Sequence, residues 1–306
     1  YEIRLSLVGS EMCIRDSMIG GTLNSLSGTL TPLFVGSLIG EVTKNTSIID
    51  VNPVLYIAMG VFVAAFVILS YIPIQDPKNS KTGTNVTFEY SPWNFRHFVL
   101  GAIAIFVYVG VEVGIPGTLI YYLSDTTGLG GGLPKATATA IAASVAATYW
   151  FLMLIGRFIA GFIASKISSK TLMSCTTILA MILITTAIVL GKSAAVSMPA
   201  FTGSAFNMVV VPVSALLLVL CGLCTSVMWP CIFNLATEGL GKYTEPASGI
   251  FMMMVVGGGL LPLLQNFIAD QSGYLVSYFV PLAGVAYMCF YTLIGSKNVN
   301  KDIPVD

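Results

Sequence analysis

The chain has 306 residues, of which 56% are hydrophobic and only 9% are charged, and its formal net charge is zero. Soluble domains carry about 25% charged residues, so this composition argues against an ordinary soluble enzyme and favours a protein that lies in a lipid bilayer. The balanced charge also argues against the basic surface with which proteins bind nucleic acid.

The first 17 residues, YEIRLSLVGSEMCIRDS, show neither helical nor strand periodicity. They also lack the apolar core and cleavage site of a signal peptide. Back-translated, they resemble a flow-cell primer and the transposon adapter of shotgun sequencing libraries, separated by the length of a sample index. We therefore expect residues 1–17 to be a translated adapter and Met18 to lie inside a longer gene. The alternative is a true polar N-terminus.

Apolar runs bounded by polar loops predict an all-α membrane protein with about eight transmembrane helices, since roughly 20 apolar residues cross a bilayer. The longest polar segment, residues 75–96, separates two spans from six. This arrangement suggests two six-helix halves: residues 18–74 would be the last two spans of the first half, and residues 97–295 the complete second half. The predicted spans are 18–40, 53–73, 97–123, 137–165, 171–191, 208–237, 246–269 and 276–295.

Lys and Arg residues in the loops indicate the orientation, because cytoplasmic loops are enriched in both. One side holds eight of them and the other side holds three. We therefore expect the central loop 75–96 and the tail 296–306 to be cytoplasmic, in a bacterial inner (plasma) membrane. The first side carries Lys78, Lys81, Arg96, Lys166, Lys170, Lys242, Lys297 and Lys301; the other carries Lys44, Lys135 and Lys192.

Two polar residues within the predicted spans are candidate ligand contacts. Glu112 lies near the middle of span 97–123, where a carboxylate is costly unless it faces a polar cavity or a partner. It could bind substrate or carry a proton, or it could simply pair with Arg157. The Asn24 amide offers two donors and an acceptor, which suits a polyhydroxy ligand. An interhelical hydrogen bond is the alternative for Asn24.

Four further residues are weaker candidates. Trp229 precedes Pro230, whose ring kinks a helix, and its indole could stack on a ligand or pack in the core. Gln265, near an outer helix end, could face the cavity or form a hydrogen bond with the neighbouring loop. Arg157 could pair with a carboxylate when a cytoplasmic gate closes, or snorkel to the interface. Asn234 has the position of a gate or cap residue.

Small residues and cysteines give less specific signals. Gly257, Gly258 and Gly259 form a small-residue surface that would permit either rocking or static close packing of helices. Cys221 and Cys224 form a C-x-x-C pair, but no histidine or second cysteine pair lies nearby, so we expect packing cysteines. His97, the single histidine, is expected at the membrane interface. No cofactor or metal site is predicted.

Several stretches resemble the fucose/glucose/galactose:proton symporter family of the major facilitator superfamily. They are GGTLNSLSGTLTPLFVGSLI (20–39), FVYVGVEVGIPGTLIYYL (106–123), IGRFIAGFIASKISSKTLM (155–173) and, most specifically, residues 226–270 from SVMWP to NFIAD. The resemblance implies a partial major facilitator fold and import of a hexose or deoxyhexose with a proton by alternating access. It places a sugar-contacting Asn at Asn24. It often places Gln at the position of Glu112, which favours a sugar contact there over proton transfer.

The resemblance also implies that the proton-carrying acidic residues lie in spans that precede this chain, and that the protein is a monomer in the bilayer. Two other function classes are weighed against it. A facilitator-type carrier of an organic anion would need more buried cationic residues than Arg157. An integral-membrane transferase would need a reactive cluster of His, Asp, metal ligands or a nucleophile with its base, and the sequence offers none.

Overall fold

The computed structural model describes residues 20–31, 34, 47–72, 89–163, 166–202, 205–300 and 302–305. It divides into two parts, residues 1–33 with 92–306 and residues 34–91, and each part is described by itself. Seven described helical segments are long and apolar enough to cross a membrane. The segment 1–17, most of the second half of span 18–40 and most of the loop 75–96 lie outside the described residues.

The smaller part contains one long helix, α2 (Ile48–Tyr71), at the predicted span 53–73. Apolar side chains occupy all of its faces, and large ones such as Phe62 and Phe66 are exposed. A helix that is apolar all round is suited to lipid rather than to water. The second predicted span is therefore confirmed as a helix, with a start five residues earlier than expected.

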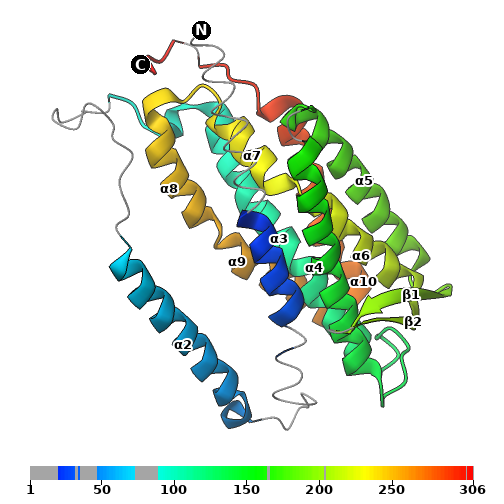
Figure 1. Ribbon diagram of the computed structural model, residues 1–306. Helices are drawn as coiled ribbons and strands as arrows, with labels where there is room; N and C mark the ends of the chain where they lie inside the picture. The colour runs from blue at the N-terminus through cyan, green and yellow to red at the C-terminus, as the bar shows by residue number, and fades with distance from the viewer. Residues whose placement is uncertain are drawn as a thin grey trace. The chain divides into compact units, whose positions relative to one another are not determined.

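The larger part is a bundle that contains the six predicted C-terminal spans (Figure 1). Helices α3 (Arg96–Ser124), α4 (Ala138–Ile163) and α5 (Ser169–Leu190) correspond to the first three. At 1.5 Å per residue, each of these three helices is longer than the roughly 30 Å thickness of the hydrocarbon core of a bilayer. All three predicted spans are thus confirmed within two residues at their described ends.

The three remaining spans are interrupted helices. Backbone breaks at membrane depth are tolerated where they are buried in protein or line a cavity. The fourth span consists of α6 (Val213–Thr225) and α7 (Met228–Thr237). The fifth follows the short η2 (Gly241–Tyr243) and consists of α8 (Thr244–Met254) and α9 (Gly257–Ser272). The sixth comprises α10 (Tyr274–Ser277), α11 (Phe279–Phe290) and a π-helical turn, Tyr291–Gly295.

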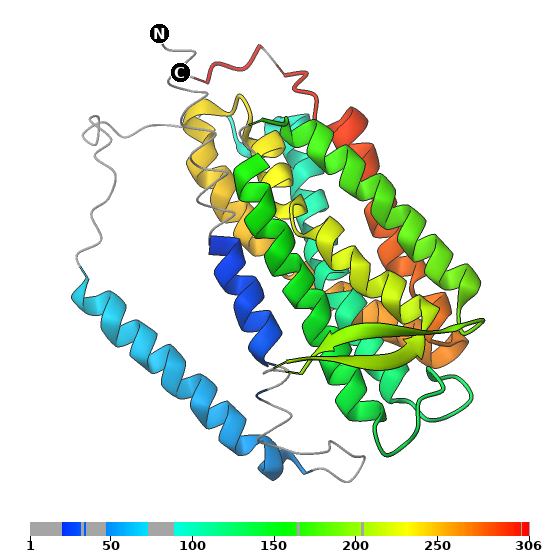
Figure 2. The same cartoon turned by 45° about the vertical axis from the view of Figure 1, so that its right-hand side comes forward.

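A β-hairpin in the connection between α5 and α6 corrects the prediction that residues 208–212 begin a span. Strands β1 (Ala195–Phe201) and β2 (Phe206–Pro212) pair antiparallel, with Pro199 opposite Met208. The hairpin crosses the bundle against α4 and α6 (Figure 2). Valines at 209–211 favour a strand, and Pro212 delays the start of the helix to Val213.

Glycine allows α3 and α9 to pack in close contact. A β-carbon on Gly257 would overlap the carbonyl of Phe106, and one on Gly110 would overlap the side chain of Leu261. Gly259, by contrast, has nothing within 4 Å of the position of a β-carbon. The predicted small-residue surface is therefore a tight helix contact at Gly257 but not at Gly259.

The helical residues 20–31, dark blue in Figure 1, pack against α4. A β-carbon on Gly28 would lie 2.8 Å from the indole ring of Trp150, so the helix backbone lies directly on that ring. Ser25 and Thr29 are buried on the same face. Through this contact, helix 20–31 lies on the side of the bundle where α3, α4 and α7 meet.

The C-terminal tail closes the opposite end of the bundle from the hairpin (Figure 1). The Asn300 side chain accepts a hydrogen bond from the backbone N–H of Arg96 at 3.0 Å, and Val305 accepts one from Lys242 at 3.1 Å. His97 is fully buried, and its Nε2 donates to the carbonyl of Glu238 at 3.0 Å. The expected interfacial position of His97, in the first turn of α3, stays a prediction, and its side chain is buried against the α7–η2 turn.

Candidate functional site

The site begins with a carboxylate on α3. Tyr108 and Glu112 are four residues apart, so they lie on one face of the helix. Tyr108 is fully buried and Glu112 is 7% exposed. An uncompensated carboxylate at this depth would cost several kcal/mol, so Glu112 requires a partner.

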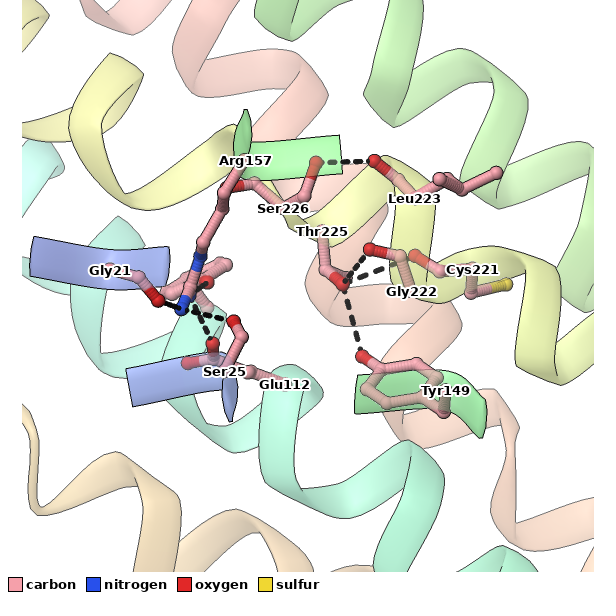
Figure 3. A network of polar contacts seen from close by, with 11 residues as sticks. Gly21, Ser25, Glu112, Tyr149, Arg157, Cys221, Gly222, Leu223, Thr225 and Ser226 are labelled. Atoms are coloured by element: carbon pink, nitrogen blue, oxygen red, sulfur yellow. Dashed lines mark hydrogen bonds and ion pairs between the residues drawn. The ribbon is translucent and has the colours of Figure 1, made fainter. Parts of the chain in front are cut away.

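Arg157 of α4 is that partner. Its Nη2 lies 2.7 Å from Glu112 Oε1 and donates to the Tyr108 hydroxyl at 3.3 Å. Its Nη1 donates to the Gly21 carbonyl at 2.5 Å and to Ser25 Oγ at 2.7 Å (Figure 3). Its Nε donates to the Ser226 carbonyl at 3.3 Å.

All five N–H groups of the Arg157 guanidinium therefore have an acceptor. The residue is 4% exposed, and its donors are all bound by acceptors within the protein. This burial argues against the snorkelling alternative. Instead, Arg157 connects three elements: helix 20–31, α3 and the α6–α7 junction.

The Ser226 carbonyl is free to accept because of Pro230. In a continuous helix this carbonyl would bond the backbone N–H of residue 230, but proline has none. The next backbone bond along the helix, from Cys231 to the Val227 carbonyl, is present at 3.3 Å. The predicted kink at Pro230 therefore exposes a backbone acceptor at the depth of the Arg157–Glu112 pair.

A hollow of about 560 Å³ adjoins the ion pair. It lies within the range of roughly 300–1,000 Å³ that small-molecule sites occupy. Its polar side chains are Asn24, Glu112 and Arg157, and its aromatic side chains are Trp150 and Trp229. The remaining lining residues are Gly20, Gly21, Val109, Val113, Pro230 and Val255.

The hollow brings together four of the six residues that the sequence singles out: Asn24, Glu112, Trp229 and Arg157. Asn24 is exposed toward it from helix 20–31, and Trp229 is half-buried 6.2 Å from the ring of Tyr108, centroid to centroid. The Glu112–Arg157 pair, weighed from the sequence as an alternative to a ligand contact, forms at the edge of the hollow. Glu112 therefore lines the hollow and is paired with Arg157 at the same time, while its contact with a ligand stays a prediction.

The other two sequence candidates are not among the lining residues. Gln265 of α9 is 1% exposed and fills the space above Gly114 of α3, and no described residue hydrogen-bonds its Nε2. Asn234 of α7 donates to Ser169 Oγ at the start of α5, at 3.0 Å. Asn234 thus joins two helices of the same bundle near the end that carries the C-terminal tail.

Sequence reasoning overlooked Tyr108, Trp150 and Ser25. Tyr108 precedes Glu112 by one helical turn, and Trp150 precedes Arg157 by two turns, so helical spacing from the two charged residues would have found both. Ser25 follows Asn24 in the N-S motif, and its hydroxyl is buried toward Arg157. Within the described residues no group of His, Cys, Asp and Glu could hold a metal ion.

Comparisons with known proteins place this geometry in a family. No family model matches the chain. It is 34% identical over 280 residues to a glucose/galactose transporter of Brucella abortus, and 30% identical over 298 residues to a putative glucose/galactose transporter of Helicobacter pylori. It is 24% identical over 220 residues to the L-fucose-proton symporter of Escherichia coli.

These matches cover 90%, 93% and 71% of the chain, and 62%, 66% and 44% of the respective relatives. The chain thus spans a little under two thirds of the length of the two glucose/galactose transporters. The fold is similar to a crystal structure of the major facilitator transporter FucP in its outward conformation. The TM-score is 0.61 at 19% identity, over 95% of this chain and 69% of that one.

The predicted partial major facilitator fold and the resemblance read from the motifs are both confirmed. The chain is a multi-pass membrane protein with a partial major facilitator fold, and its sequence is similar to glucose/galactose transporters and to an L-fucose-proton symporter.

Proposed function

We propose that the natural protein, longer than this chain, is a secondary transporter that imports a hexose or deoxyhexose together with a proton by alternating access. The observation that carries the proposal is the hollow beside the Glu112–Arg157 pair. A pyranose presents hydroxyl groups and apolar ring faces. The hollow offers an amide, a carboxylate and two indoles, which match both kinds of surface.

Asn24 and Glu112 would bind sugar hydroxyls, and Trp229 would stack on the ring. Helix 20–31 belongs to the proposed first half of the transporter and α3–α11 to the second, so the hollow lies between halves, where such transporters bind substrate. Arg157 bonds Gly21 and Ser25 across this boundary. Those two bonds would have to change when the halves rock, which gives Arg157 its gating role.

The proton would be carried by acidic residues of spans that precede residue 18. The ion pair disfavours Glu112 as the proton carrier, because a carboxylate held by Arg157 is poorly placed to exchange protons. The saturated guanidinium also argues against an organic anion as substrate, since it has no free donor. The relatives are named as transporters, which disfavours a transferase.

The protein would act as a monomer in the bacterial inner membrane, surrounded by lipid and without a cofactor or a nucleic-acid partner. Its central loop 75–96 and its C-terminal tail 296–306 would face the cytoplasm. The excess of Lys and Arg on that side supports this orientation.

Uptake of radiolabelled fucose, glucose, galactose and N-acetylglucosamine by cells that express the natural protein tests the proposal. We expect at least one of these sugars to accumulate, and an inward proton gradient to stimulate its uptake. Glu112→Ala should lower that uptake roughly 10- to 100-fold, the equivalent of a lost hydrogen bond to a charged group.

Glu245→Ala is the matched control, because Glu245 is an exposed carboxylate in the first turn of α8, outside the hollow. It should import at the parental rate. Absence of uptake of all four sugars would overturn the transport proposal. Parental uptake by Glu112→Ala would remove Glu112 from the binding site while leaving the transport proposal in place.

A further inference from the structure

The β1–β2 hairpin carries an apolar outward face that is largely exposed. From Ser193 to Thr237 the sequence contains no charged residue. Phe206, Met208 and Val210 alternate along β2 and are 48%, 67% and 56% exposed. Pro199, opposite Met208, extends this face across β1, while Met198 and Ala200 point inward and are buried.

The hairpin is anchored on α4 well below the helix end. The backbone N–H of Phe201 donates to Thr148 Oγ1 at 2.8 Å, and the rings of Phe201 and Phe206 pack on Phe151 at 5.5 and 5.2 Å between centroids. Thr148 lies ten residues beyond Ala138, the first residue of α4. At 1.5 Å per residue that is about 15 Å along the helix axis.

This anchor fixes the depth of the hairpin tip in a bilayer. Helix α4 has 26 residues and is therefore about 39 Å long, against a hydrocarbon core of about 30 Å. If the core lay wholly within the length of α4, Thr148 would lie roughly 6–15 Å inside its boundary. Phe201, which bonds Thr148, lies at the same depth.

The hydrogen-bonding needs of the two strand edges limit the depth at which the hairpin can lie in the bilayer. Along β1, two of the outward positions have no free N–H, since Pro199 has none and that of Phe201 donates to Thr148. Along β2 the alternation of an antiparallel ladder turns the N–H groups of Phe206, Met208 and Val210 to the outer edge. No described residue accepts from them. Hydrocarbon offers no acceptor, so this edge requires that the hydrocarbon boundary lie near Thr148, where lipid ester carbonyls and water are present.

We propose that the β1–β2 hairpin is a membrane-interface element, whose outward face of Pro199, Phe206, Met208 and Val210 binds phospholipid acyl chains at the bundle end opposite the C-terminus. It continues the lipid-facing surface of the neighbouring helix, where Ile178, Leu179 and Ile182 of α5 are exposed. The inference depends on the membrane spans and not on the sugar site, so the two proposals fail independently.

A nitroxide label at Met208→Cys tests whether the outward face of the hairpin contacts lipid. The natural protein is labelled and reconstituted in vesicles of phosphatidylcholine and phosphatidylglycerol. Cys175, the exposed cysteine among the described ones, is first replaced by Ser. Collision rates are measured with oxygen, which concentrates in lipid, and with a water-soluble nickel chelate. Ile182→Cys on α5 provides the lipid reference, and Leu129→Cys, 63% exposed in the loop after α3, the aqueous reference.

We expect the Met208 label to collide more often with oxygen than with nickel, as at Ile182. Nickel collisions equal to or above those with oxygen, as at Leu129, would overturn the proposal. Dipolar broadening that persists at low protein-to-lipid ratio would also overturn it, because it would mean that a second copy of the chain covers the face. If Met208→Cys does not fold, Val210→Cys on the same face gives the same readout.

Discussion

Replacement of Arg157 by methionine is expected to lower the free energy of unfolding by about 3–5 kcal/mol and to abolish sugar uptake. The variant leaves Glu112 buried without its partner and removes all five acceptor contacts of the guanidinium. The thermal unfolding midpoint in detergent and the uptake rate in cells measure the two effects.

The double variant Arg157→Met with Glu112→Gln separates stability from function. A buried ion pair replaced on both sides is often neutral in stability, so most of the lost unfolding free energy should return. Uptake should not return, because the anionic acceptor of the hollow and the bonds to Gly21 and Ser25 are gone. A single Arg157→Met variant that unfolds at the parental temperature would show that the pair is not buried as described.

The close contact of α9 with α3 predicts a second large effect, at Gly257. A methyl group there would overlap the carbonyl of Phe106, and a backbone atom cannot move aside as a side chain can. We expect Gly257→Ala to cost about 1–3 kcal/mol or more of unfolding free energy. The thermal midpoint measures this as well.

Gly259→Ala, two residues along the same helix, is the matched control. Its methyl group meets nothing within 4 Å, and alanine is favoured over glycine in a helix by about 0.5–1 kcal/mol. The two variants should therefore shift the midpoint in opposite directions. Equal shifts would mean that helix propensity, rather than the α3–α9 contact, decides the stability of this turn.

The spans were predictable because apolar length is a strong signal in a membrane protein. The hairpin was not, since the run from Met208 to Pro212 is as apolar and uncharged as the helix that follows it. Periodicity cannot separate a short buried strand from the start of such a helix. The β-branched valines and Pro212 were the available signals for the strand.

The candidate site was predictable in part. Glu112 and Arg157 stand out because charge within a span is costly, and Trp229 because Pro230 breaks its helix. Their convergence with helix 20–31 follows from tertiary packing at Gly28 and Trp150, which no local pattern records. Gln265 was chosen for its polarity near a helix end, but the packing of α9 on α3 buries it beside Gly114, outside the hollow.

Titration of the natural protein with hexose, followed by indole fluorescence, tests most directly that a sugar binds in this hollow. In a Trp93→Phe background the described tryptophans are Trp150 and Trp229, and both line it. We predict a saturable change with the transported sugar, retained in Glu245→Ala and lost in Glu112→Ala. A titration that is unchanged in Glu112→Ala, or no saturable change in the parent protein, would contradict the account.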